Sequence, residues 1–157
     1  MTTINVNDKD LTRKLGILAA GMSDLTPLGN AIAGSFLAVV EDNFDSEGRP
    51  RWAGLNPDYA ARRKGGKILF VTGRLRGSII TKVTSNEVMI GTNLGAGSPK
   101  DNYARIHQFG GMAGRGRAVK IPARPYLPMD KNGNLQPEAV DAINDDVDFY
   151  LDKLARK

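Results

Sequence analysis

The segment YARIHQFGG, which begins at Tyr103, contains the single histidine of the chain and is followed, after a basic stretch, by IPARPYLP. Because histidine titrates near neutral pH, His107 is the first candidate for general acid or base catalysis. Such a site needs a carboxylate to orient the imidazole and a nucleophile beside it, and no G-x-S-x-G elbow occurs in the sequence. A small hydrolase or nuclease centred on His107 therefore lacks an identifiable partner residue. A half-buried histidine that makes one hydrogen bond is the favoured interpretation.

Other patterns for binding ligands fail in detail. The chain has no cysteine and one histidine, which excludes disulfides and zinc-thiolate sites and argues against structural zinc. The stretches GGKIL and GAGSPK lack the spacing of phosphate-binding loops. Asp145 and Asp146 are adjacent, so on a helix they would point about 100° apart and would not converge on one metal ion. We therefore expect no catalytic residue, no metal and no cofactor.

Charge is distributed unevenly along the 157 residues, whose net charge is +5. Residues 1–48 carry 3 basic and 7 acidic side chains, residues 49–124 carry 15 and 3, and residues 125–157 carry 4 and 7. A basic middle of +12 thus lies between ends of −4 and −3. This pattern suits a polyanionic partner, or attraction between ends and middle within one chain or between copies.

The basic loop GGMAGRGRAVK is the best candidate for contact with DNA or with another subunit. Its cationic side chains are Arg115, Arg117 and Lys120. No aromatic residues for base stacking lie between them, and no helix-turn-helix pattern accompanies the loop. A segment that folds against a neighbouring subunit would have the same composition.

Apolar spacing and prolines predict the helices that position these residues. A first amphipathic helix is expected over residues of about 8–22. Thr26 as N-cap and Pro27 at the first helical position predict a second helix that runs to Phe44. A third begins near Pro137, with acidic residues early and basic residues late, as the helix dipole favours.

The middle of the chain predicts shorter elements. Residues 79–83 and 88–90 are β-branched runs separated by a four-residue turn, which indicates a hairpin. YARIHQFG is interpreted as a short helix with Ile106 and Phe109 toward a core, and IPARPYL as an extended edge strand because its prolines lack an N–H. The expected class is α+β: two N-terminal helices, a small, mostly antiparallel sheet with a proline-containing edge strand, and a C-terminal helix.

Length and composition indicate a single domain over residues 1–157. Flexible loops are expected near residues 45–67, 93–102 and 110–120, and the lone Trp52 is expected to pack the first of them onto the core. The chain begins without a signal-peptide pattern, and its longest apolar stretch is far shorter than a membrane span. We therefore expect a protein made and used in a cytoplasm.

The order of the motifs resembles that of the phage virion morphogenesis family, which includes the tail-completion protein S of temperate phages. The resemblance runs from about Leu25 to Leu154, through GRPRWAGLNPDYAARR, ILFVTGRLRGSI, VMIGTN, YARIHQFGG and IPARPYLP. The matching positions are expected to define the fold or an interface rather than to catalyse a reaction. They include Trp52, Thr72, Gly73, Leu75, Tyr103, His107, Gln108, Gly110, Pro122, Arg124 and Pro125.

The resemblance implies a non-enzymatic structural protein of a tailed phage or prophage. Such a protein would complete the tail or join head and tail at the neck, as a homo-oligomeric ring in the virion, after assembly in the host cytoplasm. Its expected partners are copies of itself and other neck, connector, tail-tube or terminator proteins, with possible non-specific contact to DNA in a channel and no membrane. The alternative is a basic accessory protein that binds nucleic acid.

Overall fold

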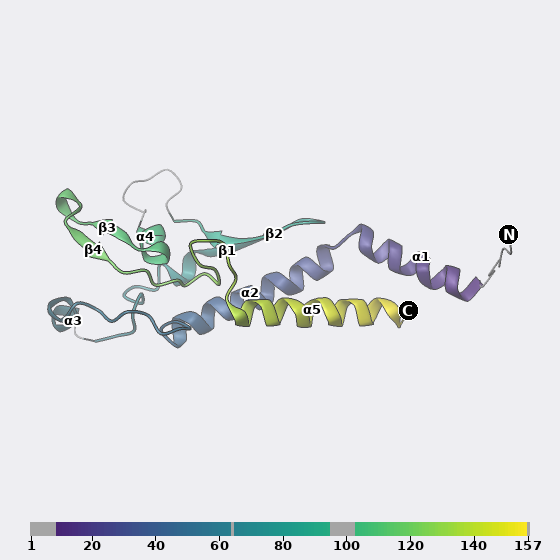
Figure 1. Cartoon of the computed structure of the whole chain (residues 1–157), viewed down its shortest axis with the longest axis horizontal. Helices are drawn as coiled ribbons and strands as arrows, with labels where there is room; N and C mark the ends of the chain where they lie inside the picture. Colours follow the sequence, from purple (N-terminus) through teal and green to yellow (C-terminus); the bar gives the residue numbers. More distant parts are fainter. Residues whose placement is uncertain (1–8, 64, 95–102, 157) are drawn as a thin grey trace, which may run out of the picture.

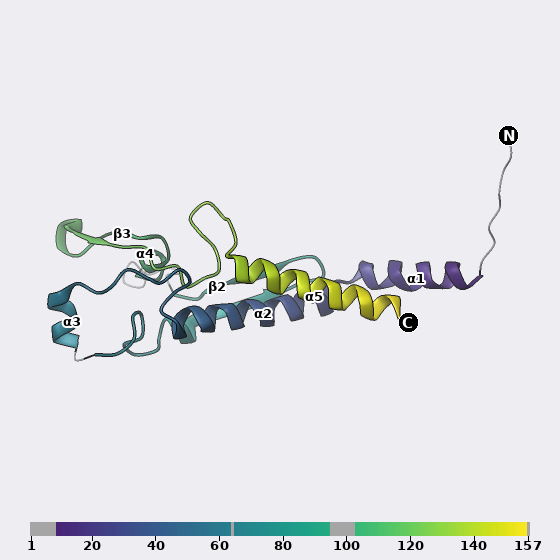
Figure 2. The ribbon, with the colours of Figure 1, turned by 60° about the horizontal axis from the view of Figure 1, so that its bottom comes forward.

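A computed structural model of the chain describes residues 9–63, 65–94 and 103–156. Three long helices give the molecule its elongated shape: α1 (Lys9–Ser23), α2 (Thr26–Asp45) and α5 (Pro137–Ala155). α2 and α5 lie side by side and run in opposite directions, while α1 projects beyond them (Figures 1 and 2). No helix within the described ranges is long and apolar enough to cross a membrane.

The helix predictions are confirmed to within two residues. Pro27 and Pro137 each lie in the first turn, where a residue without an N–H costs no helical hydrogen bond. One detail of the prediction is wrong, because Thr26 is the first helical residue rather than the N-cap. Its backbone N–H donates instead to the side-chain oxygen of Asp24 at 2.9 Å, so a residue two positions earlier begins the turn.

The predicted hairpin is present as β1 (Ile79–Val83) and β2 (Val88–Thr92), which pair antiparallel and pack on α2. The helix approaches this hairpin closely at Gly29, which is buried. A Cβ at that position would lie 2.7 Å from Cγ1 of Val83. Gly29 therefore lets α2 and the hairpin come together.

The opposite end of the molecule consists of short elements (Figure 1). These are α3 (Pro57–Arg63), the 3-10 turn η1 (Arg76–Ser78), α4 (Tyr103–Phe109), β3 (Gly111–Ala113), the turn η3 (Arg115–Arg117) and β4 (Val119–Ile121). The region predicted as a loop at 110–120 thus contains a second hairpin, and the one at 45–67 contains α3. Most of the loop expected at 93–102 lies outside the described residues.

The α+β class, with helices at both ends of the chain and antiparallel strands between them, is confirmed. In detail, the described strands form two separate two-stranded hairpins rather than one sheet. β4 ends at Ile121, directly before Pro122, and the segment expected as an edge strand continues without a ladder. Proline cannot donate to a ladder, so the backbone of this segment must be satisfied in another way.

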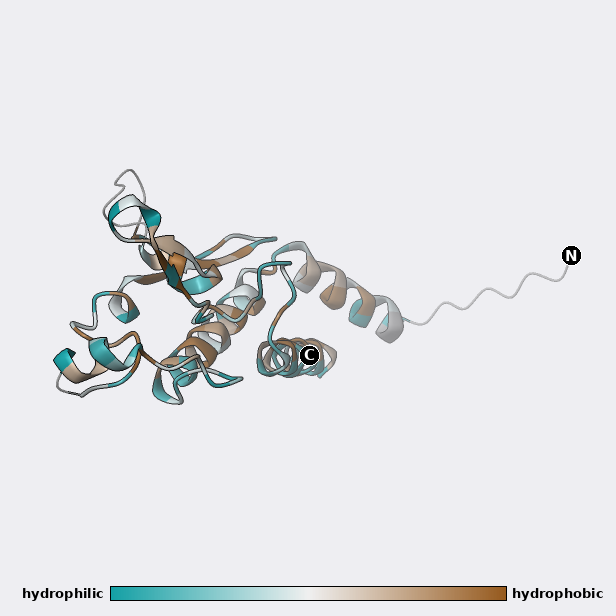
Figure 3. Ribbon diagram, turned by 60° about the vertical axis from the view of Figure 1, so that its left-hand side comes forward, coloured by the Kyte–Doolittle hydropathy of each residue, from teal (hydrophilic) through white to brown (hydrophobic). Residues whose placement is uncertain are grey.

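The main core lies where α2 meets the short elements. Phe44, Trp52 and Tyr126 are buried together, with Phe44 edge-on to Trp52 at a centroid distance of 5.9 Å and tilted against Tyr126 at 5.7 Å. A second cluster joins Phe36 and Val39 of α2 to Ala139 of α5. Hydrophobic residues accordingly follow the length of α2 (Figure 3).

Two glycines of α2 provide a matched test of this packing. Gly29→Ala should lower the free energy of unfolding by about 1–3 kcal/mol, because the added methyl group forces Val83 to shift. Gly34 has nothing within 4 Å of a built Cβ, so Gly34→Ala should raise stability by about 0.5–1 kcal/mol through helix propensity. Urea unfolding followed by circular dichroism measures both, and an equal gain in the two variants would contradict the close approach at Gly29.

Candidate functional site

The motif segments around His107 and Arg124 meet in the structure, where α4 lies beside the extended chain of residues 122–129. The N–H of Arg124 donates to the carbonyl of His107 at 2.7 Å. The following backbone groups of the extended chain are bonded largely by side chains. The motif residues are therefore joined by one network of buried polar contacts.

Gln108 takes the place of a neighbouring strand. Its side chain is 2% exposed, and its Oε1 accepts the N–H of Tyr126 at 3.0 Å and that of Leu127 at 2.9 Å. Its Nε2 donates to the carbonyls of Met129 at 2.8 Å and of Leu127 at 3.4 Å. One amide side chain thus satisfies two donors and two acceptors of a segment that has no ladder partner.

Trp52 and Arg124 fasten the loop after α2 to the same segment. The indole Nε1 of Trp52 donates to the carbonyl of Pro125 at 2.9 Å. In return Arg124 donates from Nε to the carbonyl of Ala53 and from Nη2 to that of Gly54, both at 2.8 Å. Because these contacts connect two parts of the chain about 70 residues apart, they fix the position of the loop before α3.

Sequence reasoning missed Asn43, which joins α2 to this network. Asn43 is fully buried, and its Nδ2 donates to Gln136 Oε1 at 2.9 Å and to the carbonyl of Tyr126 at 3.3 Å. Its Oδ1 accepts from Arg49 Nε at 3.2 Å. The available signal was its position on the apolar stripe of α2, where it follows Phe36 and Val40 at helical spacing.

Tyr126 is the buried centre of the extended segment. Its hydroxyl donates to the carbonyl of Ala104 at 3.3 Å, and burial raises the pKa of Tyr126 to about 12. Tyr103, at the start of α4, is half-buried against the same core. In contrast, the expectation that Phe109 points into the core is wrong: Phe109 is 43% exposed, and the buried residues of α4 are Ala104 and Gln108.

The TGRLRGS motif attaches the first hairpin to α2. Leu75 is buried in the core, Gly73 has a φ of +74°, and the exposed Thr72 accepts the N–H of Arg74 at 3.3 Å. Arg76, which was not singled out from the sequence, pairs with two carboxylates of α2. Its partners are Glu41 and Asp45, the latter at 2.9 Å. The hydrogen bond from Arg76, and then one from Lys67, lowers the pKa of Asp45.

Gly110 ends α4 and permits the close approach of the extended segment. Its φ is +75°, and its N–H donates to the carbonyl of Ile106 at 2.7 Å. A Cβ there would lie 3.0 Å from the nitrogen of Ala123 and 3.2 Å from the carbonyl oxygen of Ile121. Both the left-handed conformation and the contact with backbone favour glycine at this position.

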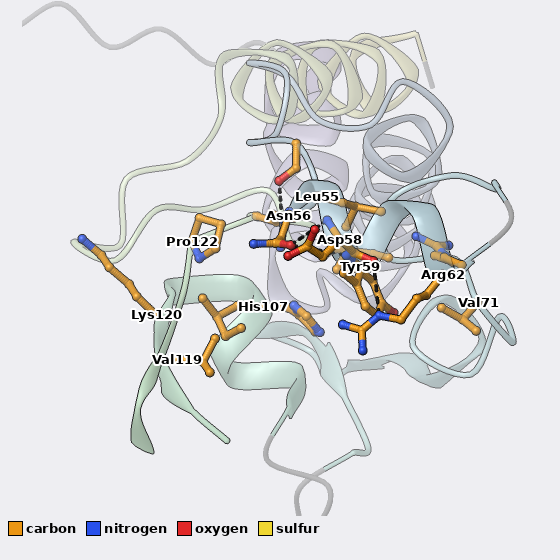
Figure 4. A pocket seen from close by; sticks show the side chains of 15 residues that line it. Leu55, Asn56, Asp58, Tyr59, Arg62, Val71, His107, Val119, Lys120 and Pro122 are labelled. Atoms are coloured by element: carbon orange, nitrogen blue, oxygen red, sulfur yellow. Dashed lines mark hydrogen bonds between the residues drawn. The ribbon is translucent and has the colours of Figure 1, made fainter. Parts of the chain in front are cut away.

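A cavity of about 590 Å³ opens beside this network. Figure 4 shows His107, Val119, Lys120 and Pro122 on one side of it, facing residues that lead into and form α3. α3 is held at its start by Asn56, whose Oδ1 accepts the N–H groups of Asp58 and Tyr59. The wall of the cavity thus combines apolar surface with cationic side chains.

The His107 side chain lines this cavity without the hydrogen bond expected of it. Its Nδ1 is buried and has no hydrogen-bond partner within the described part of the chain. Burial, and then the charge of Arg124, lowers the pKa of His107 below its ordinary 6.5. No hydrogen bond joins it to Asp58, the one acidic side chain among those lining the cavity in the described ranges.

The cationic candidates Arg115, Arg117 and Lys120 all lie exposed on the second hairpin. Their contact with DNA or with another subunit stays a prediction. Within residues 9–63, 65–94 and 103–156, no group of three or more His, Cys, Asp or Glu side chains is arranged to hold a metal ion.

The role of Gln108 can be tested by an apolar substitution of similar size. Gln108→Met leaves the N–H groups of Tyr126 and Leu127 and the carbonyl of Met129 without their partner, while the carbonyl of Leu127 keeps the N–H of Met129. We expect the free energy of unfolding to fall by roughly 2–4 kcal/mol in urea titrations. Arg105→Met, at an exposed position of the same helix, is the control and should change stability by less than about 0.5 kcal/mol; similar losses in both variants would contradict the assigned role.

The lowered pKa of His107 predicts a pH dependence of stability. Because the unfolded chain binds this proton at a higher pH than the folded chain, stability should fall as the pH drops through 6.5 toward the lower pKa of the folded state. We expect the free energy of unfolding to decrease from about pH 7 to about pH 5 more steeply for the wild type than for His107→Gln. The pKa of Asp45 lies below 3.8, so that group does not contribute in this window, and equal slopes would contradict the burial of a neutral His107.

Comparisons with known proteins agree with the resemblance in the motifs. Residues 6–152 match the phage virion morphogenesis family. The "Mu-like prophage FluMu G protein 2" of Haemophilus influenzae is 38% identical over 151 residues, which are 96% of this chain and 96% of that protein. The "Putative capsid assembly protein G" of Escherichia phage Mu is 33% identical over 130 residues, 76% of this chain and 78% of the relative. No solved structure gives a significant match. The chain belongs to the phage virion morphogenesis family.

Proposed function

We propose that this protein is a structural subunit that assembles with copies of itself into a ring at the neck or the tail end of a phage particle. Membership of the family supports a structural or assembly role among other phage proteins. The name of the phage Mu relative, a putative capsid assembly protein, agrees with such a role. In this proposal the protein acts by contact and has no enzymatic activity.

The observation that carries the proposal is the use of the motif side chains within the fold. Trp52, Gln108 and Arg124 direct their hydrogen bonds to backbone groups of their own chain. Residues used in this way hold a frame in place and do not form a reactive set. The frame is an elongated body with long helices at one end and short elements at the other (Figure 1).

A ring of identical subunits needs two different surfaces that fit each other, because each copy must contact one neighbour by each side. The chain provides surfaces of opposite charge. The exposed side of α5 carries acidic residues, and the second hairpin carries exposed basic residues at the other end of the molecule (Figure 2). Complementary charge of this kind sets the orientation of neighbouring subunits.

Binding of nucleic acid is the second candidate, favoured by the second hairpin. Arg115, Arg117 and Lys120 are exposed, and no described residue forms an ion pair or side-chain hydrogen bond with any of them. In a ring these side chains could line a channel and contact DNA phosphates without reading sequence. As an accessory DNA-binding protein, the chain would instead bind duplex DNA as a monomer.

Light scattering coupled to size-exclusion chromatography distinguishes the two functions. The purified full chain is measured at low and high salt, with and without a short DNA duplex. We expect a single closed oligomer whose mass does not depend on DNA. A monomer that shifts with DNA at low salt and is released at high salt, with loss of binding in Arg115→Ala and Arg117→Ala, would overturn the structural assignment.

A further inference from the structure

The cavity beside His107 has the chemistry of a receptor for a carboxylate on an apolar surface. Arg124 is 5% exposed, yet no carboxylate of the described residues pairs with its guanidinium. His107 lines the same cavity, but its Nδ1 is covered by the protein and is therefore not offered to a ligand. The Nε and Nη2 of Arg124 donate to neutral backbone carbonyls, so the charge of this guanidinium is not balanced by a described carboxylate. Buried charges are normally paired, so Arg124 on the wall of the cavity indicates that an anionic group from outside completes the site.

The rim and the walls of the cavity restrict the ligand further. Arg62 and Lys120 line it and are exposed, so the entrance is cationic. Val71 and Val119 are 66% and 54% exposed, which leaves apolar surface uncovered in the same cavity. A nucleic acid backbone would satisfy the cations and leave this apolar surface in water. An acidic protein surface with a hydrophobic side chain would cover both.

Such a surface is present on α5. Phe149 is 73% exposed, the highest value among the large exposed hydrophobic side chains of the described residues. Asp145 is exposed four residues before it, on the same face of the helix, and the exposed Asp148 lies beside Asp145 at the edge of that face. Asp152, three residues after Phe149, is exposed as well and pairs with Arg156 at 3.4 Å. The packed side of α5, with Ala139 and Leu154, faces the rest of the molecule.

We propose that Phe149 of one copy inserts into the His107 cavity of the next copy, with Asp145 and Asp148 beside it paired to the cations Arg62, Lys120 and Arg124 of the cavity. A single aromatic anchor in a pocket, surrounded by polar contacts, is the usual form of an interface hot spot. The cavity volume of about 590 Å³ is sufficient for an aromatic ring and the carboxylates beside it. This inference rests on the proposed self-assembly and names the two surfaces that perform it.

The positions of the two surfaces require a contact between copies. The cavity lies among α3, α4 and β4, while Phe149 lies in the half of α5 that points away from these elements (Figures 1 and 2). One copy therefore cannot fill its own cavity. A contact between two different surfaces repeats from copy to copy, and it closes into a ring when the rotation between copies permits.

Disulfide trapping tests the contact directly, because the chain has no native cysteine. The double variant Val71→Cys with Phe149→Cys places one thiol in the cavity and one on the proposed anchor. Under mild oxidation we expect a ladder of covalent multimers in denaturing electrophoresis. Val71→Cys with Met22→Cys is the control, since Met22 is 62% exposed on α1 and lies outside the proposed contact, and it should remain mostly monomeric.

Charge reversal and anchor removal provide the second measurement. We expect Phe149→Ala to weaken self-association roughly thirtyfold in sedimentation equilibrium, as for the loss of a hot spot. Arg62→Glu and Asp148→Arg should each weaken it, and the two changes together should restore it. Asp141→Arg, on the early part of α5, is the control reversal. All variants are first compared with the wild type by thermal unfolding, so that a loss of folding is recognised.

The outcomes separate this inference from the proposed ring. A wild type that remains monomeric at the highest concentration, together with no ladder from the paired-cysteine variant, overturns both the ring and the contact. A wild type that associates normally, with unchanged association in Phe149→Ala and no ladder from the paired cysteines, overturns the contact and leaves the ring intact. A ladder together with rescue by the double charge reversal supports both.

Discussion

The structure depends on a proline-containing segment whose backbone has no strand partner. Residues 122–129 run through the centre of the molecule, and Tyr126 and Pro128 are among its most deeply buried residues. Buried N–H and C=O groups must be hydrogen-bonded, because leaving one unpaired costs on the order of 1–3 kcal/mol. Gln108, Trp52 and Asn43 supply these bonds from three different parts of the chain. Their side chains thereby fix how α2, the following loop and α4 are placed relative to one another.

This constraint explains why the motif residues occur together. Gln108 reaches the segment only if α4 ends beside it, and Gly110 permits this close ending. Arg124 holds the loop that leads into α3, and so sets one wall of the cavity. The same contacts that complete the core therefore shape the outward-facing hollow. In our account, this hollow is where the frame meets another subunit.

The parts of the fold that could be predicted from the sequence are those specified locally. Pro27 and Pro137 mark helix starts because proline fixes φ and needs no hydrogen-bond partner in the first turn. The hairpin of residues 79–92 has runs rich in β-branched residues on both sides of a short turn. The second hairpin lacks such a signal, because each of its strands has only three residues and Gly114 and Gly116 between them adopt positive φ values.

The polar network was predictable only in part, since it depends on contacts between distant segments. The motif pattern singled out Gln108 and Arg124, but their partners became known only from the fold. The inward direction expected for Phe109 was wrong because α4 turns Ala104 and Gln108 to the core instead. Asn43 was missed because a polar residue within an apolar stripe has no identifiable partner before the helices are placed.

Hydrogen exchange of single amides tests the central constraint most directly. The N–H groups of Tyr126 and Leu127 donate to the side chain of Gln108, whereas the N–H of Asn132 lies in an exposed turn. In native-state NMR, the amides of Tyr126 and Leu127 should exchange only through global unfolding, and therefore slowly. The amide of Asn132 should exchange fast. Exchange of all three amides at the rate of the exposed turn would show that side-chain bonds do not hold this segment, and would contradict the account.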